Sequence, residues 1–375
     1  MRSILLSGSL ILSFFSQAQQ NAWLVTGTYT SGKSEGIYVF RINSVTGEAS
    51  QVSIAKGIKN PSYLAVAPDL QYVYAVEEIN GDGNSGKLVS YRFNKKDGSL
   101  TEQNKEPSGG DDPCYITTDK SGKWLIAGNY TSGTLSVLPI NRDGIIGEPL
   151  CKITHQGSSA NKERQTSPHV HATVLDAENN FLYVPDLGVD KVFIYAFNKK
   201  TGKLSPASTP FAIVKAGSGP RHLTFSDNGR YAYLAEELTG TVTVFTVDKK
   251  TGALTSIQSV SASKPGFSGF MGSADIHISP DGKFLYSSNR GDANDISIFN
   301  INAANGKLIY ITSEPVLGKA PRNFCIDPSG NMLLVANQNS DEIVIFYRDK
   351  NTGRLKDSGK RISVPNPVCL KWVKP

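Results

Sequence analysis

The chain has 375 residues, with 39 Lys and Arg against 33 Asp and Glu, a formal net charge of +6, 39% hydrophobic residues, 35 Gly and 4 Cys. This composition excludes a disordered chain and a coiled coil, and the length suits one large or two average domains. The charge is mild for this length, and many Lys residues lie in turn sequences such as Asn198-Lys199-Lys200. We therefore attribute the charge to solubility and predict no nucleic-acid partner.

The first 18 residues have the pattern of a secretory signal peptide. Arg2 precedes an apolar run from Ile4 to Phe15, and Ser16-Gln17-Ala18 forms a small-x-small cleavage site. The run is too short to cross a membrane, and no later segment approaches the roughly 20 apolar residues that a span needs. We expect cleavage after Ala18, export to the periplasm or beyond, and one domain over residues 19–375. The alternative is a buried N-terminal helix in a cytoplasmic protein.

The four cysteines are widely spaced and form no C-x-x-C motif or Cys/His cluster. The sequence therefore predicts no metal site, and nothing in it indicates a cofactor. An oxidising compartment would permit a disulfide, but three of the four lie in apolar, strand-like runs, where a small buried thiol is expected. These three are Cys114, Cys325 and Cys369.

A hairpin signal ending in glycine recurs seven times along the chain. Its glycines are 51, 46, 58, 50, 54 and 47 residues apart. Glycine supplies the positive φ that tight β-turns demand, so each copy should connect two antiparallel strands. The seven turns are Thr46-Gly47, Asp97-Gly98, Asp143-Gly144, Thr201-Gly202, Thr251-Gly252, Asn305-Gly306 and Thr352-Gly353.

The segments around each turn predict four short strands per repeat. In the fifth repeat they are residues 220–225, residues 230–235, residues 241–245 and a segment that begins at Leu254. Such β-branched and aromatic runs are typical of strands, and four of them in about 50 residues make a propeller blade. No segment has the period of a substantial helix. The sequence thus predicts an all-β, seven-bladed propeller with four-stranded antiparallel blades.

The chain ends predict how the ring closes. Residues 22–26 match the second strand of a blade, and the missing first strand reappears as residues 366–372. The C-terminal strand should therefore complete the first blade, which leaves only short outer edges exposed.

Polar residues converge at one mouth of the predicted channel. In a blade the first strand begins, and the second strand ends, on the same face of the disc. Convergent polar groups in a concavity are the default hypothesis for a binding site. The starts of first strands carry Asn60, Tyr63, Asp112, Tyr115, His169, His171, Arg221, His222, Asp275, His277, Arg322 and Asn323, and the ends of second strands carry Glu77, Glu78, Asn129, Tyr130, Asp186, Glu236, Glu237, Asn289, Arg290, Asn337 and Gln338.

Some of these residues have a structural explanation. His222 and His277 lie further along their strands, and we expect them to be hydrogen-bonded between blades. Arg221 and Arg290 are harder to explain in this way, because an arginine that faces a channel needs an anion. Glu237 could be that anion, or could share the site with a substrate.

Several motifs resemble the propeller-type lactonase family, which includes bacterial 6-phosphogluconolactonases and fungal 3-carboxy-cis,cis-muconate lactonizing enzymes. The resemblance spans essentially the whole chain after the signal. The motifs that carry it are Gly219-Pro220-Arg221-His222, Glu237-Leu238, Ala274-Asp275-Ile276-His277-Ile278 with Pro280-Asp281-Gly282, and Pro321-Arg322-Asn323-Phe324.

The resemblance implies four catalytic residues in the channel mouth: His171, Arg221, Glu237 and Arg290. His169 is a rival for His171, since a period of two puts both on one side of a strand. Glu236 is a rival for Glu237, although adjacent strand residues face opposite ways. The candidates for substrate binding are His169, Asp186, Glu236, Asp275, Arg322 and Asn323.

The resemblance implies metal-independent hydrolysis of a sugar lactone, 6-phosphogluconolactone or a related aldonolactone. Glu237 or neutral His171 would take a proton from the attacking water, while Arg221 and Arg290 would bind the oxyanion and any anionic group of the substrate. Export would favour an unphosphorylated lactone, because phosphorylated sugars belong to the cytoplasm.

Two other functions fit the same motifs. One is a cycloisomerase that acts on a muconate-like carboxylate. The other is a non-catalytic exported propeller that binds a glycan or a protein. In the second case the aromatic residues of the mouth would matter most, namely Tyr29, Tyr63, Tyr115 and Tyr130. The sequence leaves the exact substrate and the oligomeric state open.

Overall fold

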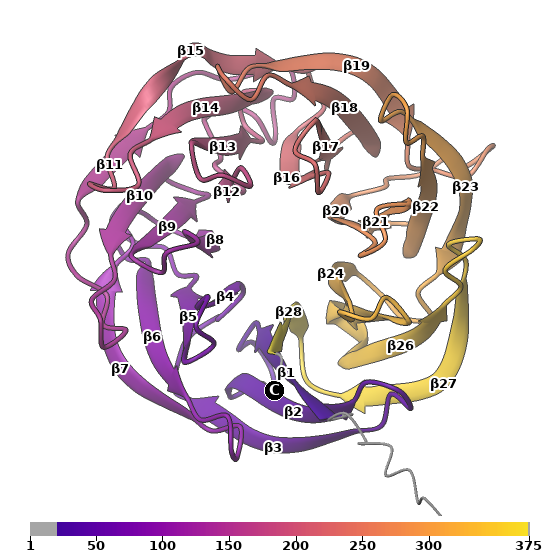
Figure 1. The fold of residues 1–375 in the computed structure, drawn as a ribbon, viewed down its shortest axis with the longest axis horizontal. Helices are drawn as coiled ribbons and strands as arrows, with labels where there is room; N and C mark the ends of the chain where they lie inside the picture. The colour runs from indigo at the N-terminus through magenta and orange to yellow at the C-terminus, as the bar shows by residue number, and fades with distance from the viewer. Residues whose placement is uncertain (1–20, 374–375) are drawn as a thin grey trace, which may run out of the picture.

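The computed structural model describes residues 21–373 and forms a ring of seven four-stranded antiparallel sheets (Figure 1). The predicted seven-bladed propeller is confirmed. Within the described range the only helical element is one turn of 3-10 helix, η1 (Gln338–Ser340), which follows a strand of the last blade. The predicted signal peptide lies outside the described residues.

The four strands of each blade succeed one another from the channel to the outer rim. In that order, the first three blades are β28 (Pro367–Val373), β1 (Asn21–Thr28), β2 (Gly36–Asn43), β3 (Ala49–Lys56); β4 (Leu64–Val66), β5 (Tyr72–Glu77), β6 (Lys87–Phe93), β7 (Leu100–Pro107); and β8 (Pro113–Thr118), β9 (Trp124–Asn129), β10 (Thr134–Pro139), β11 (Cys151–Thr154).

The fourth and fifth blades contain the predicted catalytic histidine region and the best example of the repeat. They are β12 (Val174–Leu175), β13 (Phe181–Asp186), β14 (Lys191–Phe197), β15 (Leu204–Ile213); and β16 (Pro220–Phe225), β17 (Tyr231–Glu236), β18 (Thr241–Val247), β19 (Leu254–Ser261).

The sixth and seventh blades complete the ring up to the first blade. They are β20 (Ser273–Ile278), β21 (Phe284–Asn289), β22 (Asp295–Ile301), β23 (Leu308–Pro315); and β24 (Pro321–Ile326), β25 (Met332–Asn337), β26 (Glu342–Arg348), β27 (Leu355–Ser363).

Strand β28 closes the ring by completing the first blade, as predicted. It pairs antiparallel with β1, with Trp23 opposite Val373 and Thr26 opposite Leu370. Figure 1 shows the yellow C-terminal strand on the channel side of the indigo N-terminal strand. The first blade therefore has the same four-stranded order as the other six, and its second strand is paired on both sides.

The hydrophobic core lies between neighbouring blades. Second strands such as β17 and β21 are buried along their whole length, because a blade packs on each side of them. One core cluster joins Tyr183 and Val192 of the fourth blade to Leu223 and Leu234 of the fifth. This sandwich of sheets explains why these strands read as β-branched and aromatic runs without a polar alternation.

The seven hairpin glycines allow each hairpin to pack closely against the neighbouring blade. Each lies between the third and fourth strands of its blade and has a φ between +70° and +78°. A Cβ at any of them would meet a side chain near the start of the neighbouring blade's second strand. The neighbours of Gly47, Gly98, Gly144, Gly202, Gly252, Gly306 and Gly353 are Met332, Trp23, Tyr72, Trp124, Phe181, Tyr231 and Phe284 respectively.

We expect Gly306→Ala to destabilise the propeller well beyond the cost of its positive φ. The new Cβ would overlap the ring of Tyr231, whereas a Cβ at Gly282, which has nearly the same φ, would meet nothing within 4 Å. Both alanines carry left-handed strain of about 1 kcal/mol, and overpacking adds about 1–3 kcal/mol at Gly306 alone. Thermal unfolding should show a lower melting temperature for Gly306→Ala than for Gly282→Ala. Equal melting temperatures would mean that the turn does not fasten the blades.

Helices within residues 21–373 are too short to qualify as membrane spans. The four cysteines are free thiols, and Cys114, Cys325 and Cys369 are buried as predicted.

Candidate active site

A cavity of about 440 Å³ opens at the mouth of the channel where the sequence predicted a site. Its lining combines aromatic, cationic and carboxylate side chains from several blades. The lining residues are Tyr29, Glu78, Cys114, Tyr130, Arg164, His171, Glu237, Phe270, Arg290, Gly291 and Arg322.

Strand geometry explains this convergence. Glu78, Glu237 and Arg290 each follow directly the last residue of a second strand, β5, β17 and β21. Cys114 and Arg322 are the second residues of the inner strands β8 and β24. Because the first and second strands of a blade are antiparallel, the start of the first and the end of the second lie on the same face of the propeller. A polar residue at either position can therefore reach the same cavity.

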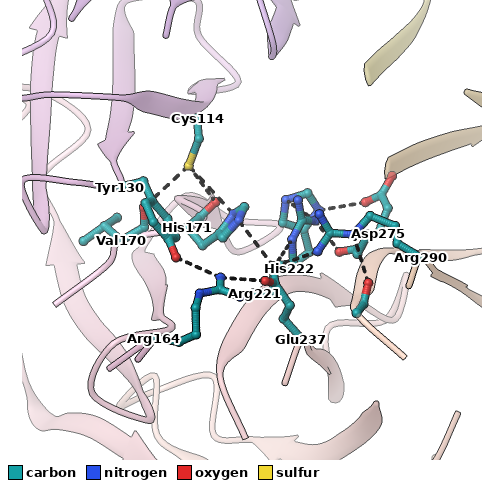
Figure 2. Close-up of polar contacts among 12 residues, drawn as sticks. Cys114, Tyr130, Arg164, Val170, His171, Arg221, His222, Glu237, Asp275 and Arg290 are labelled. Carbon is teal, nitrogen blue, oxygen red and sulfur yellow. Dashed lines mark hydrogen bonds and ion pairs between the residues drawn. The ribbon is translucent and has the colours of Figure 1, made fainter. Parts of the chain in front are cut away.

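Glu237 is the centre of the site, because three guanidinium groups surround its carboxylate (Figure 2). Arg164 Nη2 donates to Oε1 at 2.8 Å, and Arg221 Nε donates to Oε2 at 3.0 Å. Arg290 Nη2 lies 2.9 Å from the same Oε2. Charge-assisted bonds of this kind fix both partners firmly, so the carboxylate and the arginines form one rigid unit.

This unit keeps Glu237 ionised. Burial alone would raise the pKa of its carboxyl group, but the charges of Arg290, Arg221 and Arg164 outweigh that effect and hold the pKa far below its ordinary value. A carboxylate with so low a pKa is a weak proton acceptor. The geometry therefore favours Glu237 as a fixed negative charge over Glu237 as a base.

His171 lies beside this unit and is neutral. Its side chain is buried, and Nε2 lies 4.0 Å from Glu237 Oε2. Burial, followed by the charge of Arg221, lowers the pKa of the imidazole well below its ordinary value of 6.5. On the other side of the ring, Nδ1 lies 3.8 Å from Cys114 Sγ, which also approaches the carbonyl oxygens of Val170 and His171 (Figure 2).

Arg221 does not line the cavity and is among the largest fully buried side chains of the described residues. Its Nη1 donates to the carbonyl of Ala274 and lies 3.3 Å from His222 Nε2. The Nδ1 of His222 in turn lies 2.8 Å from Asp275 Oδ1. Burial lowers the pKa of Arg221 to about 10, which leaves the guanidinium charged at neutral pH. Arg221 thus supports Glu237 without lining the cavity.

Another end of the cavity contains Tyr29, Glu78 and Arg322. Tyr29 donates its hydroxyl to Glu78 Oε1 at 2.8 Å, and Ser62 donates to the other carboxylate oxygen. Burial raises the pKa of Glu78. The guanidinium carbon of Arg322 lies 5.2 Å from the centre of the Tyr29 ring.

Five of the predicted substrate-binding residues do not line the cavity. Asp186 bonds to His155 and to the backbone of His169, and Glu236 accepts hydrogen bonds from Thr241 and Thr243. Glu236 and Glu237 thus face opposite ways, as their adjacent positions predicted. The ring of His169 stacks on Tyr130 at 4.3 Å. The remaining two are Asp275 and Asn323, which bond to each other.

Asp275 explains the two histidines that the sequence assigned to structure. His222 and His277 both contact its carboxylate, the latter through Nε2 at 2.9 Å. Burial alone would raise the pKa of Asp275, but electrostatic attraction to His277 and the hydrogen bonds from His222 and His277 hold it well below its ordinary value. The bond from His222 joins the fifth and sixth blades, so the prediction that His222 is bonded between blades is confirmed. The same prediction is wrong for His277, because its bond to Asp275 lies within the single strand β20.

Four lining residues were not predicted at the site: Cys114, Arg164, Phe270 and Gly291. Arg164 is the one of these that contacts Glu237. It lies in the connection between β11 and β12 rather than at a strand end, and it also donates to the hydroxyl of Tyr130 at 3.1 Å. One signal was available: the longest spacing between hairpin glycines, 58 residues, spans this connection. Extra length in a repeat marks an inserted loop, and inserted loops often carry function.

A layer of aromatic rings separates this cavity from a second one of about 430 Å³, and the two share no lining residue. Tyr63 and Tyr115 stack at 4.2 Å, and His222 meets Tyr115 edge to face at 5.3 Å. All three line the second cavity. The ring of His222 also lies 5.4 Å from that of His171, which lines the first.

Comparisons with known proteins agree with this architecture. A family model described as "Lactonase, 7-bladed beta-propeller" matches residues 23–372. The chain is 40% identical over 351 residues to the 6-phosphogluconolactonase of Formosa agariphila, a match that covers 93% of this chain and 98% of that protein. It is 34% identical over 348 residues to the 6-phosphogluconolactonase of Bacillus subtilis, with 92% and 97% covered. The solved structure of a periplasmic gluconolactonase from Pseudomonas aeruginosa superimposes on this chain with a TM-score of 0.89 and 37% sequence identity. The match covers 94% of this chain and 99% of that structure.

Proposed function

Because the chain belongs to the seven-bladed β-propeller lactonase family, we propose that it hydrolyses a sugar lactone in the cavity around Glu237. Relatives named as 6-phosphogluconolactonases and a gluconolactonase support a substrate of the aldonolactone class. The observation that carries the proposal is one carboxylate, bound by three guanidinium groups, with the buried imidazole of His171 4.0 Å away.

We propose His171 as the group that activates water. Its pKa leaves it unprotonated at neutral pH, which a base requires, whereas Glu237 is held by arginines. A water within about 2.8 Å of both His171 Nε2 and Glu237 Oε2 fits between atoms 4.0 Å apart. The negative charge of Glu237 then stabilises the imidazolium that forms as the proton arrives.

Cys114 supports this role by selecting the tautomer of His171. When the thiol donates to the carbonyl of Val170 or His171, its sulfur accepts from Nδ1–H. That arrangement leaves the lone pair on Nε2, the nitrogen nearer Glu237. Burial raises the pKa of Cys114, so the sulfur remains a thiol and is not activated as a nucleophile.

The arginines supply the remaining electrostatic stabilisation. Arg290 and Arg164 line the cavity and are oriented by Glu237, so their charges stay in place as the oxyanion develops. In the step as we propose it, the water oxygen bonds to the lactone carbonyl carbon and its proton passes to His171. The bond from that carbon to the ring oxygen then breaks, the ring oxygen takes the proton, and an open-chain hydroxy acid remains.

We also propose that residues 1–18 direct export. The charged, apolar and small-residue regions of this segment support the proposal, as does the relative from Pseudomonas aeruginosa that is named a periplasmic gluconolactonase. An exported enzyme would meet lactones outside the cytoplasm.

The test of the function is acid release above spontaneous ring opening. Purified protein should accelerate it for 6-phosphogluconolactone or for glucono-1,5-lactone, and Arg290→Met should lower kcat about 10²- to 10³-fold, because an oriented cation at the oxyanion is lost. Background rates with both lactones, from protein whose circular dichroism shows an intact fold, would refute the lactonase proposal.

A further inference from the structure

Arg322 differs from the other three arginines at the site. The guanidinium groups of Arg164, Arg221 and Arg290 all donate to, or pair with, Glu237. Arg322 lines the same cavity, yet within residues 21–373 it has no hydrogen bond and no ion pair with another side chain. A guanidinium group carries five N–H donors, and leaving them unmet in a partly buried position is costly.

The neighbours of Arg322 hold it in place without using its donors. Tyr29 presents its ring to the guanidinium group at 5.2 Å, a cation–π contact that leaves the N–H edge open. Glu78 is the acidic residue at this end of the cavity, but its two oxygens already accept the hydroxyls of Tyr29 and Ser62. Nearby negative and polarisable groups, Tyr29 first and then Glu78, outweigh burial and raise the pKa of Arg322, so it stays charged.

The arginines of the site outnumber its carboxylates by two. Arg164, Arg221, Arg290 and Arg322 face Glu237 and Glu78, and three of the arginines share Glu237. We propose that Arg322, stacked on Tyr29, is the specificity-determining residue that binds an anionic group of the substrate, a phosphate ester or a carboxylate carried away from the lactone carbonyl. The planar fork of arginine matches either group with two parallel hydrogen bonds.

This inference rests on the proposed lactonase function and divides the cavity into two parts. The carbonyl reacts beside His171 and Glu237, and the remote anion pairs with Arg322. Phosphate and carboxylate share this chemistry but differ in source, since phosphorylated sugars are made inside cells and carboxylated sugar lactones also arise from oxidation of free sugars.

The experiment compares three lactones that differ in the remote group: 6-phosphogluconolactone with a phosphate, glucaro-1,4-lactone with a carboxylate, and uncharged glucono-1,5-lactone. Wild-type protein should prefer at least one anionic lactone, and that lactone identifies the source. Arg322→Met should lower kcat/KM for the preferred anionic lactone about 10- to 100-fold and change the value for glucono-1,5-lactone less than about threefold. Arg322→Lys keeps the positive charge but cannot form two parallel hydrogen bonds. Its kcat/KM for the preferred anionic lactone should therefore lie between those of the wild-type protein and Arg322→Met.

Arg41→Met is the matched control, because Arg41 stacks on Trp23 at 5.1 Å but is exposed to solvent outside the cavity. It should leave all three rates unchanged. An equal loss for charged and uncharged lactones in Arg322→Met, or a wild-type protein that prefers glucono-1,5-lactone, would overturn the role of Arg322.

Binding separates this inference from the proposed function. Calorimetric titration with inorganic phosphate and with glucarate measures the Arg322 subsite without turnover. If wild-type protein hydrolyses none of the lactones, the lactonase proposal fails. Anion binding that disappears in Arg322→Met would then still support the subsite, and equal binding to both proteins would refute it.

Discussion

His171→Gln should lower kcat for lactone hydrolysis about 10²- to 10⁴-fold with little change in KM. Glutamine can hold a water by hydrogen bonds but cannot accept its proton, so the substrate still binds while the chemical step loses its base. The measurement is steady-state acid release, corrected for spontaneous ring opening. Imidazole added to His171→Gly should restore part of the lost rate at saturating lactone.

The matched control is His155→Gln. His155 is as buried as His171, with about 4% of its surface exposed, but it lies outside the cavity and bonds to Asp186 and Tyr195. Its replacement should cost stability and leave kcat per folded molecule nearly unchanged. Equal losses of kcat in the two variants would show that the His171 effect is structural.

The dependence of kcat/KM on pH should also identify His171 as the base. Because the pKa of His171 is held well below 6.5, kcat/KM should stay level as the pH falls through 6.5 and decline only in more acidic solution. A decline centred near 6.5 would mean that the base is a solvent-exposed histidine and not His171.

Glu237→Gln should reduce kcat/KM about 10²- to 10³-fold and the free energy of unfolding by about 3–5 kcal/mol. The substitution keeps the shape of the side chain but leaves Arg164, Arg221 and Arg290 without their shared anion, and an uncompensated buried charge is strongly destabilising. The arginines also lose the orientation on which oxyanion stabilisation depends. Urea unfolding and lactone kinetics measure the two effects separately.

Glu77→Gln provides the comparison for loss of a buried carboxylate. Glu77 is the last residue of the second strand β5 and is about 5% exposed, like Glu237, but its partners are Lys105 and the backbone of Lys59. It should lose stability without a comparable loss of activity. A Glu237→Gln protein with wild-type kcat/KM would contradict the proposed site.

Acid should reveal the pairing of Glu237 in the wild-type protein. Its folded pKa lies below the ordinary value of 4.5, so its charge contributes full stability above pH 4.5 and loses that contribution as the pH falls toward the folded pKa. Over this acidic range the free energy of unfolding of Glu237→Gln should depend less on pH than that of the wild-type protein. The slopes of the two curves should differ by up to about 1.4 kcal/mol per pH unit. Parallel slopes for the two proteins would mean that Glu237 is not held ionised.

The fold was predictable because local chemistry repeats seven times. Glycines such as Gly252 and Gly306 need positive φ, and the runs between them have the composition of buried strands. Strand polarity alone was then enough to predict Glu237 and Arg290 at one mouth. The alternation of strand residues predicted that Glu236 and Glu237 face opposite sides, and the family resemblance indicated that Glu237 is the one in the cavity.

The rest of the site depends on contacts that no repeat encodes. Arg164 reaches Glu237 from an irregular connection whose path depends on tertiary packing. Asp186 is the last residue of β13 and Asp275 the third residue of β20, so each lies one residue away from the position that lines the cavity in other blades, and each bonds to a histidine, His155 and His222 respectively. A strand position specifies the face on which a residue lies, but the partner that captures its side chain is decided by the neighbouring blades.

The aromatic layer formed by Tyr63, Tyr115 and His222 lies between the active-site cavity and the second cavity, which have no lining residue in common. An open channel would let a lactone arrive at one face while the acid departed from the other. With the aromatic layer in place, the released acid leaves by the mouth through which the next lactone enters, and the acid and the lactone compete for the same arginines. The inserted loop that carries Arg164 lies beside that opening.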